Sequence, residues 1–259
     1  MSPELAKAYE AEGSSFAFVG PLMDVVGARR AGGLRAGQAG GEAEPADKGG
    51  GATAEVLEKA RAAHASGRGV VFASMGTVVT GDAPNFGWNA RAKGPDGVER
   101  GLTGRELCQA AWAGVFRAFG APKEDEGPLL LVALGPQASP LGDLAKPPNA
   151  VCAPVMPQVD MLRIGLDLFL THGGQNSFTE SLAHGTPVVV CPGFGDQVVN
   201  AQKAVDLGVG QKVDRPLPPA GGEAAAAATF TEEVRQRLLE VWRSPTHLAA
   251  AAGCADRLK

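Results

Sequence analysis

The segment 168–180 reads Leu168-Phe169-Leu170-Thr171-His172-Gly173-Gly174-Gln175-Asn176-Ser177-Phe178-Thr179-Glu180. Its first four residues are apolar or β-branched, which is typical of a buried strand in a parallel sheet. Gly173 and Gly174 follow, and glycines let backbone N–H groups approach an anion closely. Asn176 and Ser177 then begin a helix, where they can cap its N-terminus and where the helix dipole favours negative charge. The segment predicts a phosphate-binding turn between a strand and a helix.

The alternative is that Gly173 and Gly174 only make a tight turn between two elements. A second segment favours the ligand site, because Ser74-Met75-Gly76-Thr77 follows another apolar run, Val70–Ala73. Open α/β sheets bind ligands outside the carboxyl ends of their strands. We expect these two glycine-containing loops to face one crevice.

The rest of the chain indicates the fold class. From about residue 54 onward, short apolar runs alternate with helical patterns, which predicts an α/β fold: a Rossmann-like parallel sheet with helices on both faces. The predicted strands are Val70–Ala73, Leu129–Ala133, Val151–Ala153, Leu168–Thr171, Val188–Cys191 and Gly210–Val213. The predicted helices are Glu55–Ala65, Thr103–Phe119, Met161–Ile164, Ser177–His184, Gln197–Leu207, Thr231–Trp242 and Thr246–Leu258.

Two stretches interrupt this pattern. Thr80–Gly101 is polar and rich in glycine, and we predict a loop there. Pro216–Ala228 is a Pro, Gly and Ala run that we interpret as a flexible excursion, followed by a helix start at Thr231, whose hydroxyl precedes two acidic residues. On the predicted helix Thr103–Phe119, one face carries Trp112, Phe116 and Phe119. We expect these to be core residues rather than a ligand platform.

Composition excludes several classes of protein. The 259 residues carry 24 basic and 28 acidic side chains, a net charge of -4, and these are interspersed, so the sequence predicts no nucleic-acid partner. No apolar run is long enough for an integral membrane segment. The four cysteines are widely separated, which favours reduced thiols and a cytoplasmic location over a disulfide framework or a zinc site. Residues 27–54 hold almost no large apolar side chains, so we predict a disordered linker there and a folded domain over 55–259.

Taken in order, the motifs resemble those of the UDP-glycosyltransferase family, the two-lobed (GT-B) glycosyltransferases that use nucleotide sugars, near its macrolide and sterol branch. The resemblance covers about the last two-thirds of the chain and rests on the following series: Ser74 to Thr77, Pro157-Gln158, the element from Thr171 to Ser177 with Glu180, Gly185 to Val190, and Gly195-Asp196-Gln197. Each motif is weak alone, and their order and spacing make the match specific. The implied fold is the C-terminal, nucleotide-sugar-binding lobe.

The resemblance also implies roles for individual residues. His172 and the backbone from Gly174 to Ser177 would hold the donor's diphosphate, with further bonds from the side chains of Asn176, Ser177, Ser74 and Thr77. Glu180 would accept hydrogen bonds from the ribose, and Gln158 beside Pro157 would meet the base. Asp196 and Gln197 would bind the sugar hydroxyls. The full set of predicted donor-binding residues is Ser74, Gly76, Thr77, Pro157, Gln158, His172, Gly173, Gly174, Gln175, Asn176, Ser177, Glu180, Asp196 and Gln197.

Simpler interpretations exist for two of these residues. His172 could be a core histidine whose ring is satisfied by backbone groups. Asp196 could be the N-cap of the helix that follows it, although a carboxylate can cap a helix and bind a sugar at once.

The sequence departs from the family's pattern at three places. Many relatives stack the base on an aromatic residue two positions before Pro157, where this chain has Val155, which leaves the donor base open. Gln175 stands where the plant enzymes carry Trp. The loop Thr80–Gly101 is longer than the equivalent loop of most relatives.

The resemblance implies transfer of a hexose from a UDP-sugar, or another NDP-sugar, to a hydroxyl of a lipid or small-molecule acceptor. It places the acceptor site and the catalytic base on an N-terminal lobe, of which residues 1–26 look like a remnant. Two alternatives remain: a non-catalytic nucleotide-sugar-binding or partner-binding module, and one subunit of a split enzyme. The motifs imply no cofactor and no divalent metal for donor binding. An NAD-type enzyme is disfavoured because no G-x-G-x-x-G follows a strand.

Overall fold

The computed structural model describes residues 7, 11, 50–93 and 97–258. Its centre is a six-stranded sheet in which every pairing is parallel. The strands are β1 (Val70–Ser74), β4 (Leu129–Ala133), β5 (Ala150–Ala153), β6 (Leu168–Thr171), β7 (Val188–Val190) and β8 (Gly210–Lys212). Two of the predicted strands match the observed bounds, and the other four differ by one residue at one end. The predicted α/β fold class is confirmed.

The strand order is β5-β4-β1-β6-β7-β8. After β1, the chain adds β4 and β5 on one side of β1. It then crosses back to form β6 on the other side of β1 and adds β7 and β8 beyond it. β1 and β6 lie side by side with Ser74 opposite Thr171. This is the point at which the strand order reverses, and doubly wound sheets bind ligands in the crevice that forms there.

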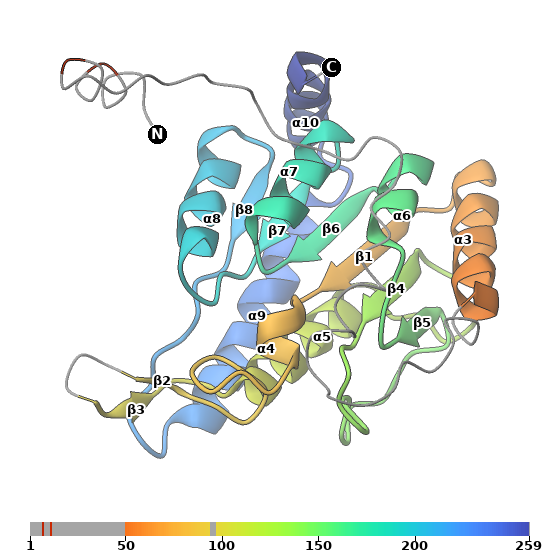
Figure 1. The fold of residues 1–259 in the computed structure, drawn as a ribbon. Coiled ribbons are helices and arrows are strands. Elements are labelled where there is room, and N and C mark those ends of the chain that lie inside the picture. Colours follow the sequence, from red (N-terminus) through yellow and green to blue (C-terminus); the bar gives the residue numbers. More distant parts are fainter. Residues whose placement is uncertain (1–6, 8–10, 12–49, 94–96, 259) are drawn as a thin grey trace, which may run out of the picture.

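Two layers of helices cover the sheet (Figure 1). Side chains alternate along each strand, so β1 sends Val71 and Ala73 into one core and Val70 and Phe72 into the other. The first core is closed by α5 (Gly104–Phe119) and α9 (Glu223–Val241). The second is closed by α3 (Gly50–Ala65), α6 (Gln158–Ile164), α7 (Gln175–Ala183), α8 (Asp196–Asp206) and α10 (Pro245–Leu258).

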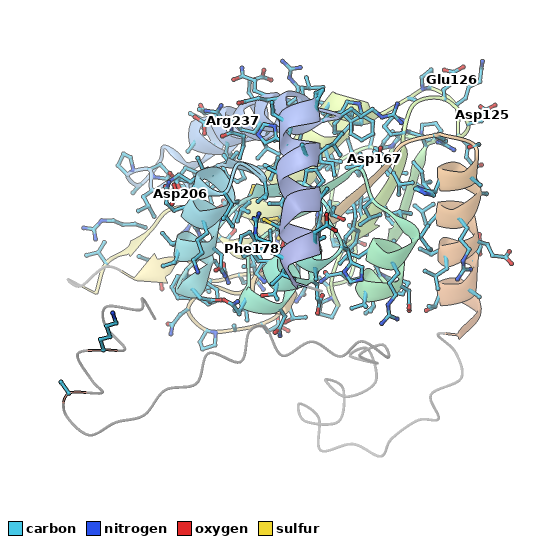
Figure 2. The ribbon with its side chains drawn as sticks, turned by 90° about the horizontal axis from the view of Figure 1, so that it is seen from above. Asp125, Glu126, Asp167, Phe178, Asp206 and Arg237 are labelled. Atoms are coloured by element: carbon cyan, nitrogen blue, oxygen red, sulfur yellow. The ribbon has the colours of Figure 1, made fainter. Side chains whose placement is uncertain are left out.

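The two cores confirm several sequence-based assignments. Trp112, Phe116 and Phe119 lie on the buried face of α5, as predicted for core residues. Phe178 lies where α7 meets α10 (Figure 2) and is 2% exposed. Thr103 caps α5 with a complete capping box, in which the Thr103 hydroxyl accepts from the Glu106 N–H and the Glu106 carboxylate accepts from the Thr103 N–H.

The predicted start of α9 is wrong. The helix begins at Glu223, inside the stretch that we interpreted as a flexible excursion, and Thr231 lies in its interior. The Thr231 hydroxyl donates to the carbonyls of Ala227 and Ala110 rather than capping a helix end. Alanine is the strongest helix former, and the alanine run packs partly against the α5 core, so these residues extend the helix.

Other predicted boundaries moved less. α3 begins at Gly50, inside the range 27–54 that was predicted as a linker. Residues 27–49, and residues 1–26 apart from Lys7 and Ala11, lie outside the described residues. The predicted loop after β1 contains the last residue of a short helix, α4 (Thr77–Thr80), and a two-stranded antiparallel ladder of β2 (Ala92–Lys93) and β3 (Glu99–Arg100).

Candidate nucleotide-sugar site

The two glycine-containing loops meet at the carboxyl ends of β1 and β6, as the sequence predicted. A Cβ added to Gly76 would lie 2.6 Å from Cε1 of His172, and one added to Gly174 would lie 2.5 Å from its Nε2. Gly76 also has φ 78°, in the left-handed region that favours glycine. The His172 imidazole is therefore held between two glycines from neighbouring strand ends, and both positions require the absence of a side chain.

His172 is largely enclosed by this arrangement. Burial lowers the pKa of His172 below its ordinary value, and the opposing effects of the Asp196 carboxylate and the Ser74 backbone are smaller. Its Nδ1 is buried and has no hydrogen-bond partner among the described residues. The Ser74 backbone engages the ring, as the alternative of a core histidine expects, so both roles of His172 stay predictions. A buried polar atom without a partner is unusual and is compatible with a ligand contact.

The N-terminus of α7 lies beside the same strand ends. Gly174 is the N-cap and supplies no side-chain bond, so the expected capping by Asn176 and Ser177 is not observed. Both residues lie instead in the first turn, where backbone N–H groups have no partner within the helix. Asn176 is exposed and Ser177 is 9% exposed. The turn offers N–H groups, an amide and a hydroxyl to an anion.

Gln158, Ser177 and Glu180 come together beside this turn. Nε2 of Gln158, the first residue of α6 after its N-cap Pro157, donates to Oε2 of Glu180 at 2.6 Å and to Oγ of Ser177 at 3.1 Å. Glu180 is 5% exposed, and the amide of Gln158 holds its carboxylate. Three residues predicted from two separate motifs thus form one hydrogen-bonded group.

Asp196 does not cap its own helix. Gly195 is the N-cap of α8, and no side chain caps that helix. Oδ2 of Asp196 instead accepts from the backbone N–H of Gln175 at 3.0 Å, so the carboxylate reaches across to the N-terminus of α7. The N-cap alternative for Asp196 is wrong. The contact joins the sugar-binding and diphosphate-binding motifs predicted by the resemblance.

Gln197 is turned into the protein and is 4% exposed. Its Oε1 accepts from the N–H groups of Gly193 and Phe194 at 2.8 and 3.2 Å. The carbonyl oxygen is therefore engaged in shaping the loop before α8. The sugar contact predicted for Gln197 would have to come from its Nε2 amide.

The remaining predicted residues take different positions. Thr77 is exposed at the start of α4, and Ser74 is half-buried at the end of β1. The Gln175 side chain is engaged locally and donates to Thr179 Oγ1 at 3.0 Å. Val155, at the position where relatives stack the base, is 55% exposed just before Gln158.

Sequence reasoning missed the role of Asn200. This residue lies one turn beyond Asp196 on α8, is 3% exposed, and donates through Nδ2 to the carbonyl of Gly173 at 2.9 Å. It fixes the turn that carries His172. The signal in the sequence was a polar residue four positions after Asp196 on the same helix. Ala201 and Ala204 beside it are buried.

Among the described residues, no group of three or more His, Cys, Asp and Glu side chains is arranged to hold a metal ion. Donor binding without a divalent metal stays a prediction. None of the helices in residues 50–93 and 97–258 combines the length and the apolar content that crossing a membrane requires.

Comparison with known proteins agrees with this geometry. Residues 142–217 match the family model described as UDP-glucoronosyl and UDP-glucosyl transferase. The anthocyanidin 3-O-glucosyltransferase of Hordeum vulgare is 33% identical over 148 residues, which are 56% of this chain and 28% of that protein. The uncharacterized UDP-glucosyltransferase YojK of Bacillus subtilis (strain 168) is 39% identical over 79 residues, 30% of this chain and 19% of that protein. The chain thus spans less than a third of either relative.

Solved structures share the fold at low sequence identity. Os79 from O. sativa in complex with UDP gives a TM-score of 0.53 at 18% identity, over 79% of this chain and 38% of that chain. A doubly substituted variant of Os79 with UDP gives 0.54 at 19% identity, over 84% and 41%. These findings show that residues 142–217 match the UDP-glycosyltransferase family model and that the chain shares the α/β fold of Os79.

Proposed function

We propose that this domain binds a UDP-sugar in the crevice between β1 and β6, with the diphosphate at the N-terminus of α7. The observation that carries the proposal is the position of His172, held between Gly76 and Gly174 with a buried Nδ1 that has no partner among the described residues. The helix dipole, the first-turn N–H groups and the imidazole together favour an anion there. UDP is the ligand of the Os79 complexes, which have the same fold.

The group formed by Gln158, Ser177 and Glu180 supplies the nucleoside end of the proposed site. A carboxylate that is buried and held by an amide is a fixed acceptor for two vicinal ribose hydroxyls. Gln158 keeps one amide carbonyl for the base edge. The exposed Val155 offers an apolar surface to the base in place of an aromatic ring. Asp196 and the amide of Gln197 face the donor sugar in this proposal.

The reaction proposed for the whole enzyme is transfer of a hexose to a hydroxyl of a lipid or small molecule. The acceptor oxygen forms a bond to the anomeric carbon, the bond from that carbon to the diphosphate breaks, and a base takes the hydroxyl proton. The N-terminus of α7 and His172 stabilise the charge on the departing UDP. We place the acceptor site and the base outside the described residues.

Exposed apolar side chains support a covering lobe or subunit. Large hydrophobic residues that remain exposed include Val78 on α4, Val155 before α6, and Val198 and Val199 in the first turn of α8. Each of these three helices begins at a residue of the proposed site.

All four cysteines are free, which supports the proposed cytoplasmic location.

Replacing Asn176 and Ser177 together by alanine is expected to weaken UDP binding about tenfold or more, because two donors to a charged diphosphate are lost. Calorimetric titration of the full chain with UDP, UDP-glucose and dTDP measures this and also reports the base preference. Gln202→Ala, which truncates an exposed amide on α8, is the matched control and should bind as the wild type does. If the wild type binds UDP and the double variant binds it equally well, the diphosphate does not bind at the N-terminus of α7. Binding without transfer, even when an acceptor lobe is supplied, would favour the non-catalytic alternative.

The affinity for UDP-glucose is expected to rise as the pH falls toward and below about 6.5. Burial depresses the pKa of His172 in the free protein, and a bound diphosphate would raise it, so proton uptake accompanies binding. Calorimetry in buffers of different ionisation enthalpy measures that uptake. His172→Gln should abolish it, and His184→Gln, which changes the half-buried C-cap residue of α7, should not. A pH-independent affinity in the wild type would contradict the assignment.

The same shift has a consequence for stability. Because the folded state favours neutral His172, the unfolded state binds the proton more readily below the ordinary pKa. The contribution of this group to stability is therefore present above about pH 6.5 and is lost as the pH falls below it.

A further inference from the structure

Two phenylalanines meet beside the turn that carries Asp196 and Gln197. Phe86 belongs to the loop after α4, and Phe194 is the second residue before Asp196. Their rings are stacked, with centroids 4.4 Å apart and planes at 24°. The two residues are far apart in the sequence, so the stack joins the loop after β1 to the loop after β7. We call residues 81–91 the Phe86 loop.

The Phe86 loop is anchored to α5. Trp88 is 4% exposed and lies against Trp112 of α5, with ring centroids 6.2 Å apart. Backbone hydrogen bonds from Gly104 to Gly87 and from Arg105 to Trp88 tie the loop to the start of α5 at 3.1 and 2.8 Å. These contacts with α5 therefore fix the position of the Phe86 loop, and with it the position of the Phe86 side chain.

A cation completes the contact. The guanidinium of Arg215 lies 5.9 Å from the centre of the Phe86 ring, and its Nη2 donates to the carbonyl of Leu102. A Cβ added to Gly193 would lie 3.8 Å from Nη1 of Arg215, which places the cation beside the same turn. Arg215 thus links the Phe86 loop, the start of α5 and the turn before α8.

On one side of the turn Asp196 accepts from the Gln175 N–H, and on the other side lies Phe194. Gly195 has φ 60° and no atom within 4 Å of an added Cβ, and α8 begins without a side-chain cap. Gln197 fixes the N–H groups of Gly193 and Phe194, which precede the glycine. The direction in which Asp196 leaves the turn therefore depends on where Phe194 is held as well as on its bond to Gln175.

We propose that Phe86, backed by Arg215, is a positioning residue for the donor sugar: it stacks on Phe194 and so fixes the turn that presents Asp196 to the sugar ring. The inference rests on the proposed function and deepens it. It assigns the Phe86 loop to recognition of the hexose and leaves recognition of UDP to α6 and α7. Phe86 itself need not touch the ligand.

The test compares the affinity for UDP with the affinities for UDP-glucose, UDP-galactose, UDP-glucuronate and UDP-N-acetylglucosamine in the full chain. Phe86→Ala should lower the affinity for the preferred UDP-sugar by about three- to tenfold, the range expected for a lost aromatic pair, and leave UDP affinity unchanged. Phe86→Tyr should restore it because the stack is kept. Asn85→Ala, at the exposed neighbouring position, is the matched control. Phe194→Leu, alone and combined with Phe86→Ala, completes a double-mutant cycle whose coupling should appear only with UDP-sugars.

The outcomes separate this inference from the proposed function. No binding of UDP by the wild type would overturn the proposed function and the inference with it. A wild type that binds UDP and discriminates among the sugars, with Phe86→Ala doing so equally well, would overturn the inference alone. Two other results would also overturn the inference alone. One is a wild type whose affinity for every UDP-sugar equals its affinity for UDP. The other is a Phe86→Ala variant that loses affinity for UDP and for UDP-sugars equally.

Discussion

Gly174→Ala is expected to weaken the binding of UDP and UDP-glucose by about ten- to hundredfold, the loss expected when hydrogen bonds to a charged group are broken. The backbone of Gly174 has φ -57° and ψ 145°, which alanine adopts without strain. The new methyl group, however, would lie 2.5 Å from Nε2 of His172. The imidazole has to move, and Gly76 blocks it on another side. Calorimetric titration of the folded variant measures the loss.

Two variants make this result specific. Gly253→Ala exchanges the same residues on α10, where the nearest atom to the new Cβ is 3.7 Å away, and should keep wild-type affinity. Adding Gly174→Ala to His172→Ala should cost little more than His172→Ala alone, because the clashing ring is absent. If Gly174→Ala binds UDP normally, the diphosphate does not lie against His172 and the proposed site is wrong.

Trp112→Ala is expected to lower the free energy of unfolding by about 3–5 kcal/mol, the cost of emptying a large aromatic site in a core. Trp112 lies on the buried face of α5 and has the largest side chain among the fully buried residues. It also supports Trp88 and through it the Phe86 loop, so donor-sugar discrimination should weaken along with stability. Urea unfolding at a fixed pH measures the change.

The conservative replacement should behave differently. Nε1 of Trp112 is buried without a partner among the described residues, so Trp112→Phe removes an unsatisfied donor and leaves a smaller cavity. We expect a loss of roughly 1–2 kcal/mol for this variant. Leu239→Ala, at a 43% exposed position of α9, should cost less than about 1 kcal/mol. A loss below about 1.5 kcal/mol for Trp112→Ala would contradict the assigned packing.

The α/β fold was predictable because its strands are short, apolar and buried on both faces. Such runs carry their signal locally, and Leu129–Ala133 and Leu168–Thr171 were located residue for residue. The start of α9 was missed because its alanines look like a low-complexity linker until α5 is present to pack against them. The helical propensity of the alanines is supported by contacts with α5, and the hydrogen bond from Thr231 to Ala110 spans 121 residues of sequence.

The sequence by itself determined the strand, the glycines and the helix that make the phosphate-binding turn, since these act through backbone geometry over a few neighbouring residues. It also indicated the second loop at Gly76. Only the tertiary structure decided how distant side chains meet at that turn. Asp196 reaches the N–H of Gln175 instead of capping α8, Asn200 holds Gly173, and Phe86 stacks on Phe194. Each of these contacts depends on the order in which the strands pair, because strand order decides which loops become neighbours at the edge of the sheet.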